Sequence, residues 1–390
     1  MNGGEPAAAA AQGPLRVTTL ELFFDLVFAF TLTQLTAILT GSLSVITVGR
    51  VLLLFGLLWW MYEGYAWLTN ARPPVRAAER ILLLTGMAGF LIVGLAIPHG
   101  FGADGVELGL GYLLVVVVHA ILYYRVNANI VRIAPFNLAS ALLVTAAGLA
   151  GGAARYPLWV AALAVQLGSP LIVHPRNLFE LRPGHLSERH SALLIVALGE
   201  SVAAIGIGAA ALAGRPAGAG SRLVTSAVLG LALTAALWWI IFGGDEEERA
   251  EQVLTSATSE RRTALALAAL FYGNIPILLG LVAMAAGVQE AVAQSGRPAA
   301  GHLAAAAMLA AGAALFLGGD VAVRRLLRTG ATAPRAAGAT AALATTAAGA
   351  TVGLDAQLAL LTVVLVAMLA AELRWETPRD AESTGGDTAG

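Results

Sequence analysis

The sequence predicts an all-α, polytopic integral membrane protein with about 12 transmembrane helices in two parallel six-helix repeats and both termini cytoplasmic. Three observations lead to this prediction: the composition, the number of long apolar stretches, and the placement of the basic residues. Of 390 residues, 58% are hydrophobic and only 12% are charged, whereas soluble domains are about a quarter charged. This composition excludes the ordinary soluble class.

A helix needs about 20 mainly apolar residues to cross the hydrocarbon core of a bilayer. Twelve stretches meet this requirement or nearly do: roughly 18–41, 47–68, 79–98, 106–125, 134–152, 157–174, 189–211, 221–243, 262–287, 301–323, 334–352 and 354–373. The fifth and eleventh are the weakest, because they are rich in Ala, Gly and Thr, and a long loop is the alternative for each. Helices of small residues can nevertheless pack inside a membrane bundle.

The basic residues, all of them Arg, favour one orientation. If the N-terminus is cytoplasmic, 18 of the 23 lie on the cytoplasmic side of the twelve spans and 5 lie on the other side. Basic residues are enriched in cytoplasmic loops. The split therefore favours both the twelve-span count and cytoplasmic termini.

Short matches between the two halves of the chain indicate an internal duplication. They keep their order, and their offsets rise from 179 to 181 to 199 positions. The matched pairs are Trp59-Trp60 with Trp238-Trp239, Glu79-Arg80 with Glu260-Arg261, and Ala134-Pro135 with Ala333-Pro334. Because six is even, both repeats have the same orientation. In transporters with parallel repeats, the binding site lies at the repeat interface near the midplane.

The predicted organisation has five parts. Residues 1–17 form a disordered N-terminal arm, 18–176 the first six-helix repeat, 177–188 a cytoplasmic loop, 189–373 the second six-helix repeat, and 374–390 a disordered C-terminal tail.

Several chemistries are not indicated. The chain has no Cys, which excludes disulfides and thiolate metal sites. Its net charge of −1 does not suggest a nucleic-acid partner. It has no phosphate-binding glycine loop, no GxSxG and no HExxH motif. We therefore expect no enzymatic activity, no cofactor and no metal site.

Two acidic residues lie in the first predicted span. Glu21 and Asp25 are four residues apart and share one helix face. A carboxylate inside a span costs roughly 2.5–3.5 kcal/mol on insertion scales, so each should find a partner, water or a proton. Glu21 is a candidate ion-binding residue, with a simple interfacial position as the alternative. Asp25 is a stronger candidate, with an ion pair to Arg16 or to a neighbouring span as the alternative.

The second span ends in a cluster of aromatic residues around one acid. Trp60, Glu63 and Trp67 share a helix face by their spacing. An interfacial aromatic belt is the alternative for the tryptophans. Glu63 lies at a similar predicted depth to Glu21 and Asp25, so an acidic cluster between the first two spans is geometrically possible.

Glu200 in the seventh span is the deepest acid in the sequence. It lies 11 residues, or about 17 Å, beyond Arg189, near the bilayer centre. Ser201 follows it directly. In the ninth span, Asn274 precedes Pro276, which frees a carbonyl and often kinks a helix. These residues complete the predicted solute- or ion-binding set; for Glu200 the alternative is a buried protonated acid that fixes helix packing.

Several of these motifs resemble one bacterial family. The segment 20–28, Leu-Glu-Leu-Phe-Phe-Asp-Leu-Val-Phe, is similar to the first-span signature of the low temperature requirement A family. Glu188-Arg189 with 198–201, and Trp59-Trp60 with Thr69-Asn70, are similar to further family signatures. The chain departs from the pattern at 71–76 and at His190-Ser191. The resemblance implies a multi-pass protein of the bacterial cytoplasmic (inner) membrane, named from growth at low temperature, with no transport substrate implied.

These features favour a secondary transporter or proton-coupled permease of unknown substrate. Asp25 and Glu200 would bind the solute or the coupling ion at corresponding places in the two repeats, assisted by Glu63 and Glu21. Two alternatives remain: a cation channel, since the six-plus-six layout is similar to that of lysosomal and bacterial potassium channels, and a non-transporting membrane protein for cold adaptation. The expected partners are the lipid bilayer and a small solute or ion, including protons; the sequence does not indicate an oligomeric state.

Overall fold

The computed structural model describes residues 16–124, 130–173, 181–212, 220–297, 299 and 301–384. Every regular element in this part of the chain is a helix. The first half contains α1 (Thr19–Gly41), α2 (Val45–Ala71), α3 (Ala77–Ala96), α4 (Gly105–Tyr124), α5 (Ile130–Leu149) and α6 (Arg155–Val173). Short 3-10 turns, η1 (Ile97–His99) and η2 (Gly152–Ala154), lie in two of its connections.

The second half is less regular. It contains α7 (Pro183–Ala210), α8 (Gly220–Phe242), α9 (Glu246–Ser256), α10 (Ser259–Ala266), the π-helical segment η3 (Leu267–Tyr272), α11 (Asn274–Ala293), α12 (Leu303–Leu327), α13 (Ala333–Ala344), α14 (Thr346–Thr351) and α15 (Leu354–Thr384).

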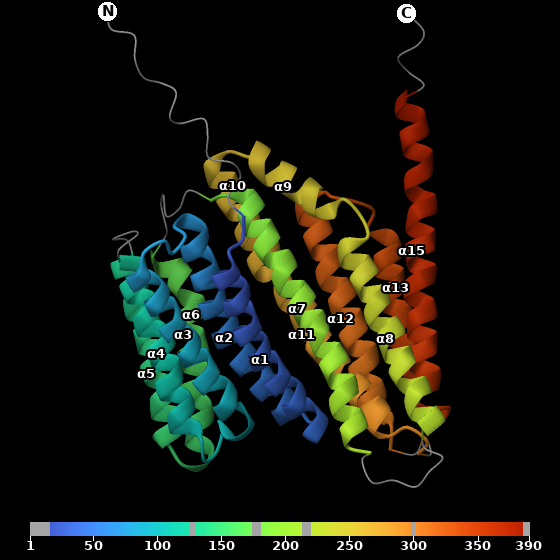
Figure 1. Ribbon diagram of the computed structural model, residues 1–390, viewed down its shortest axis with the longest axis horizontal. Coiled ribbons are helices and arrows are strands. Elements are labelled where there is room, and N and C mark those ends of the chain that lie inside the picture. The colour runs from blue at the N-terminus through green and yellow to red at the C-terminus, as the bar shows by residue number, and fades with distance from the viewer. Residues whose placement is uncertain are drawn as a thin grey trace, which may run out of the picture.

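The helices form one bundle in which α1 lies between two groups (Figure 1). Helices α2 to α6 gather on one side of it. On the other side, α1 packs against α7 and α11. In the first group, α3 packs on α1 and α4, and α5 packs on α4 and α6. In the second group, α11 packs on α7 and α12, and α13 packs on α12 and α15. Helices α9 and α10 lie across one end of the bundle, the end at which α1 begins and α15 ends.

Ten helical stretches among the described residues are long and apolar enough to cross a membrane. They correspond to ten of the twelve predicted spans, with boundaries that differ. The other two fall in α6 and in the pair α13 and α14, where the helix is interrupted at Thr345. The prediction of a polytopic all-α membrane protein is thus confirmed, while the count of twelve is not.

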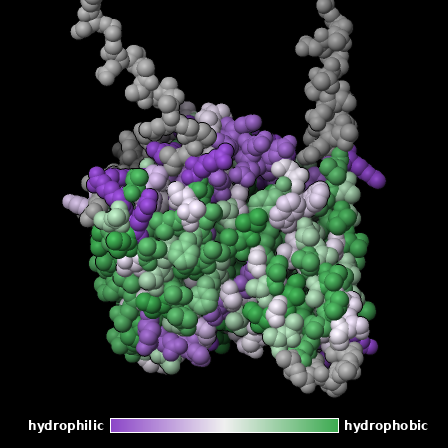
Figure 2. Space-filling model, viewed as in Figure 1, coloured by the Kyte–Doolittle hydropathy of each residue, from purple (hydrophilic) through white to green (hydrophobic). Residues whose placement is uncertain are grey.

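The surface is banded as a bilayer requires. In Figure 2 an apolar belt surrounds the middle of the molecule, and hydrophilic residues gather at its two ends. Large apolar side chains on the outside of the helices, such as Leu26, Ile81, Ile195 and Val228, are more than half exposed. In a membrane these side chains contact lipid, so their exposure does not oppose folding.

Close glycine contacts join one pair of helices in each group. A Cβ atom at Gly89 of α3 would lie 3.1 Å from the carbonyl oxygen of Gly111 of α4, and a Cβ at Gly280 of α11 would lie 2.6 Å from that of Gly312 of α12. Membrane helices use such small residues to bring their backbones together. In both pairs the absence of a side chain lets dispersion contacts form along the whole interface.

The segment η3 interrupts the regular helix directly before Asn274 and Pro276. A proline has no N–H to donate, which leaves a carbonyl in the preceding turn free. The Phe271 carbonyl accepts a hydrogen bond from Trp59 Nε1 of α2 at 3.1 Å. The irregular turn therefore joins the two halves of the chain, and Asn274 is buried beside it.

Helix α7 begins six residues before the predicted span, at Pro183. Its N-cap position is Arg182, although Ser187 is the residue of this segment whose type is preferred at helix N-caps. Residues 183–188, expected in a loop, thus form the first turns of the helix. As a result, Arg189 lies inside the helix, where it is only 1% exposed.

Candidate functional site

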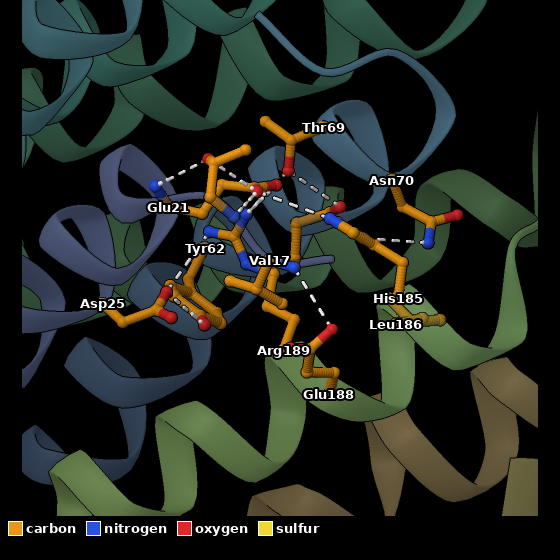
Figure 3. Close-up of polar contacts among 12 residues, drawn as sticks. Val17, Glu21, Asp25, Tyr62, Thr69, Asn70, His185, Leu186, Glu188 and Arg189 are labelled. Atoms are coloured by element: carbon orange, nitrogen blue, oxygen red, sulfur yellow. Dashed lines mark hydrogen bonds and ion pairs between the residues drawn. The ribbon is translucent and has the colours of Figure 1, made fainter. Parts of the chain in front are cut away.

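A buried ion network joins α1 to α7 at the end of the bundle where both helices begin (Figure 3). Arg189 of α7 donates from Nη1 to Glu21 Oε1 at 3.0 Å and from Nη2 to Asp25 Oδ1 at 3.2 Å. Both carboxylates are 0% exposed. The pairing follows from helix geometry, since Glu21 and Asp25 are one turn apart on the face of α1 that meets α7.

Local structure fixes Glu21 in this position. Thr18 caps α1 by accepting a hydrogen bond from the Glu21 N–H, and the Thr18 N–H donates back to Glu21 Oε2 at 2.9 Å. This is the reciprocal capping box of a helix N-terminus. On the α2 side, Thr69 Oγ1 accepts from Arg189 Nη1 at 2.6 Å. Glu21 therefore does not reach the surface; it is an internal partner of Arg189.

His185 extends the network toward α2. Its Nδ1 lies 3.3 Å from Asn70 Nδ2, an amide that donates, and its Nε2 lies 3.4 Å from Glu21 Oε2. These contacts fit a neutral ring that accepts at Nδ1 and donates at Nε2. Asn70 also bonds the Arg182 backbone, accepting from its N–H at 3.1 Å and donating to its carbonyl at 2.9 Å. The Thr-Asn pair at the end of α2 thus anchors the start of α7.

Aromatic rings surround the guanidinium. Arg189 Cζ lies 5.7 Å from the ring centroids of Phe24 and Tyr62, a favourable cation–π distance. Tyr62 donates its hydroxyl to Asp25 Oδ1 at 2.8 Å, whereas Asp25 Oδ2 makes no hydrogen bond within the described part of the chain. With His185 neutral, Glu21, Asp25 and Arg189 have a formal charge of −1.

Glu63, the acid of α2, pairs with α7 through a shared proton. His190 Nδ1 lies 2.8 Å from the Leu186 carbonyl, and Nε2 lies 2.9 Å from Glu63 Oε1. A carbonyl only accepts, so Nδ1 must donate, and the contact between Nε2 and the carboxyl group then requires one more proton. That proton is either on the imidazole or on the acid. Glu63 Oε2 also accepts from Trp67 Nε1 at 3.1 Å.

Glu200 forms a separate polar site farther along the same two helices. Thr33 of α1 donates to its Oε2 at 2.5 Å, while Oε1 has no hydrogen-bond partner among the residues that the structure describes. Thr33 is 12 residues beyond Glu21, and Glu200 is 11 beyond Arg189, so about 17 Å of helix separates the two sites. Glu200 is 6% exposed and forms no ion pair with a described residue. An unpaired buried charge is costly there, which makes Glu200 suited to hold a proton.

A cavity of about 170 Å³ lies where the first helix group meets η3. Helix α2 contributes Trp60, Glu63 and Trp67, and η3 contributes Phe271. The cavity is also lined by residues of α4, α5 and α6, among them His119, Tyr123, Asn137 and Ser169. Glu63 is therefore shared between the cavity and the hydrogen bond to His190.

The predicted site residues are thus distributed over four places. Glu21 and Asp25 lie in the ion network, Glu63 and Trp60 at the cavity, Glu200 and Ser201 at the deeper site, and Asn274 beside η3. Trp60 Nε1 donates to Asn137 Oδ1 at 3.0 Å. The acids of spans 1 and 2 all pair with α7: Glu21 and Asp25 contact Arg189, and Glu63 contacts His190. Of these three acids, only Glu63 is among the residues that line the cavity.

A second buried charge cluster lies where the sequence pattern alone indicates surface features. The four-residue spacing of Asp320 and Arg324 is typical of an exposed ion pair on a helix. The charge run from Asp245 to Arg249 is typical of a solvated face. Instead, Arg324 and Arg335 are each 2% exposed and contact Glu246, Asp320 and Glu372. Helices α9, α12, α13 and α15 meet there.

Comparison with known proteins gives two findings. The sequence model described as bacterial low temperature requirement A protein (LtrA) matches residues 16–371. The uncharacterized protein RA0937 of Rhizobium meliloti (strain 1021) is 28% identical over 202 residues, which cover 48% of this chain and 49% of that protein. The chain thus spans about half the length of this relative.

Proposed function

Since the chain belongs to the bacterial low temperature requirement A family, a membrane protein family, we propose that it is a secondary transporter that couples a small solute to protons. The observation that carries the proposal is the Glu63–His190 pair, which must hold a proton and whose acid lines a cavity. Proton-holding groups inside a membrane bundle are typical of proton relays in transporters. The proposal involves no catalysed reaction, cofactor or nucleic-acid partner.

The arrangement of the helices supports a duplicated carrier. The order in which helices pack in the first group recurs in the second, with α3 and α4 corresponding to α11 and α12. The Gly89–Gly111 and Gly280–Gly312 contacts occupy corresponding places. In carriers with parallel repeats, one half moves against the other around a site at their interface. Here the ion network, the cavity and Glu200 all lie where the two halves meet.

We place the protein in the bacterial cytoplasmic membrane, with both termini cytoplasmic. The excess of arginine at one set of loop ends supports this orientation. The start of α1 and the end of α15 lie at the same end of the helical bundle, as this orientation requires (Figure 1).

Glu200 provides a direct test of proton coupling. In proteoliposomes with an internal pH dye, a panel of external organic cations, organic anions, amino acids and sugars is expected to include a solute whose gradient moves protons. Glu200→Gln is expected to reduce this proton movement by about tenfold or more, because the amide preserves shape but cannot exchange a proton. Glu107→Gln, an isosteric change at an exposed acid, is the matched control.

The same experiment separates the other functions. Single-channel currents without solute coupling would indicate a cation channel, and no flux of any solute would indicate a non-transporting protein. If a folded Glu200→Gln variant moves protons at the wild-type rate, Glu200 has no part in the coupling mechanism.

A further inference from the structure

The cavity beside Glu63 is lined by aromatic rings from three parts of the chain. Trp60 and Trp67 come from α2, Tyr123 from α4, and Phe271 and Tyr272 from η3. The faces of such rings carry partial negative charge and attract cations, most strongly when water is excluded. Aromatic linings of this kind are a known means of binding alkylated ammonium groups.

The charged and polar groups of the cavity favour a cation over an anion. Glu63 is the acid of the lining, and no arginine is among the lining residues. The base at the wall is His119, which is 4% exposed and whose Nε2 makes no hydrogen bond with a described residue. An organic anion would meet Glu63 without an arginine to offset the repulsion.

An inorganic cation is a poor match for the same lining. Calcium takes six to eight oxygen ligands and magnesium a complete octahedron of oxygens or waters. The lining is mainly aromatic and aliphatic, and the described residues contain no group of three His, Asp or Glu side chains placed to hold a metal ion. A cation with an apolar surface fits better, because it loses little hydration on entering.

The size of the cavity limits the ligand. An engineered apolar cavity of about 150 Å³ in another protein admits benzene. A cavity of about 170 Å³ therefore accepts a compact molecule of that order, such as a small quaternary ammonium compound.

We propose that this cavity binds a small organic monocation, an amine or quaternary ammonium compound, and that the bound cation replaces the proton shared by Glu63 and His190. The inference rests on the proposed proton-coupled transport and names its substrate class. The cation contacts the Glu63 carboxylate and the aromatic rings, and the pair releases its shared proton, from His190 Nε2 or from the Glu63 carboxyl group, to solvent. One positive charge enters as one leaves, so the buried site keeps its charge balance.

Calorimetric titration of the purified full-length protein in detergent tests this exchange. Choline is the cationic probe and 3,3-dimethylbutan-1-ol its neutral isostere. We expect choline to bind about tenfold or more tightly than the isostere, given the strength of cation–π and charged contacts in dry sites. Titration in two buffers of different protonation enthalpy is expected to show proton release on choline binding only.

Two variants locate the exchange. Glu63→Gln is expected to weaken choline binding to about the level of the isostere, by roughly tenfold, with Glu107→Gln unchanged as the matched control. His190→Gln leaves Glu63, which is 1% exposed, as the group that can hold the proton, so this variant is expected to retain choline binding but to release the proton over a different pH range from the wild type. This second variant tests the exchange even if Glu63→Gln does not fold.

Equal affinities for choline and its isostere, or choline binding without proton release by the wild type, would overturn the inference. The outcomes for transport are separate. Choline binding without flux of any solute would contradict the proposed transport alone, whereas proton-coupled flux of another solute without choline binding would contradict this substrate class alone.

Discussion

Replacing Arg189 with methionine is expected to destabilise the folded protein by about 3–5 kcal/mol, the usual cost of removing one partner from a buried ion pair. Glu21 and Asp25 are both 0% exposed and would lose the guanidinium that they share. Thr69 would also lose a donor. Methionine fills similar space, so the loss of stability measures the removal of the charge more than a loss of packing. The measurement is the free energy or midpoint of unfolding in detergent.

A charge-removing rescue separates this cause from a packing defect. Arg189→Met combined with Glu21→Gln and Asp25→Asn is expected to regain a large part of the stability, because no unpaired charge remains. Arg325→Met is the control, since Arg325 is exposed. If Arg189→Met is as stable as this control, the network does not hold α1 to α7.

Replacing Arg335 with methionine is expected to have a similarly large effect, again about 3–5 kcal/mol. Its cluster contains two arginines and three carboxylates, with a formal charge of −1. Arg335 contacts all three acids, Glu246 at 2.9 Å, Asp320 at 2.8 Å and Glu372 at 3.3 Å. Without Arg335, one arginine remains against three acids.

The same count of charges predicts a much smaller loss of stability when an acid of this cluster is neutralised. Glu372→Gln leaves two arginines with two carboxylates, a neutral set, and the amide oxygen can still accept from Arg335. We expect it to cost much less than Arg335→Met, by unfolding midpoint and by protease resistance of α13 and α15. A Glu372→Gln variant as unstable as Arg335→Met would contradict this charge balance.

The membrane class and most helix positions could be predicted from the sequence because they depend on local composition. A run of apolar residues produces a span regardless of its neighbours. Local composition also identified the weak stretch 334–352, which the structure divides into α13 and α14 at Thr345. The start of α7 was placed too late because a Ser-Glu-Arg-His sequence resembles a loop when its buried partners are unknown.

The partners themselves could not be predicted, because they are far apart in the chain. Arg189 and Glu21 are separated by 168 positions, and spacing along one helix does not indicate contacts across helices. Two signals were present but indirect: arginine and two histidines near the start of a span, and the Thr69-Asn70 pair at the end of another. For Asp320, the four-residue spacing to Arg324 correctly predicts a contact. The spacing does not indicate that α13 and α15 cover this contact and bury it.

The most direct test of the proposed mechanism is solute-driven proton movement in proteoliposomes that contain the wild type, Glu63→Gln or His190→Gln. With the wild type, we expect at least one solute of the panel to drive protons across the membrane. Both variants are expected to lose about tenfold or more of this proton movement while remaining folded. Proton movement at the wild-type rate in both folded variants would contradict the role of the Glu63–His190 pair.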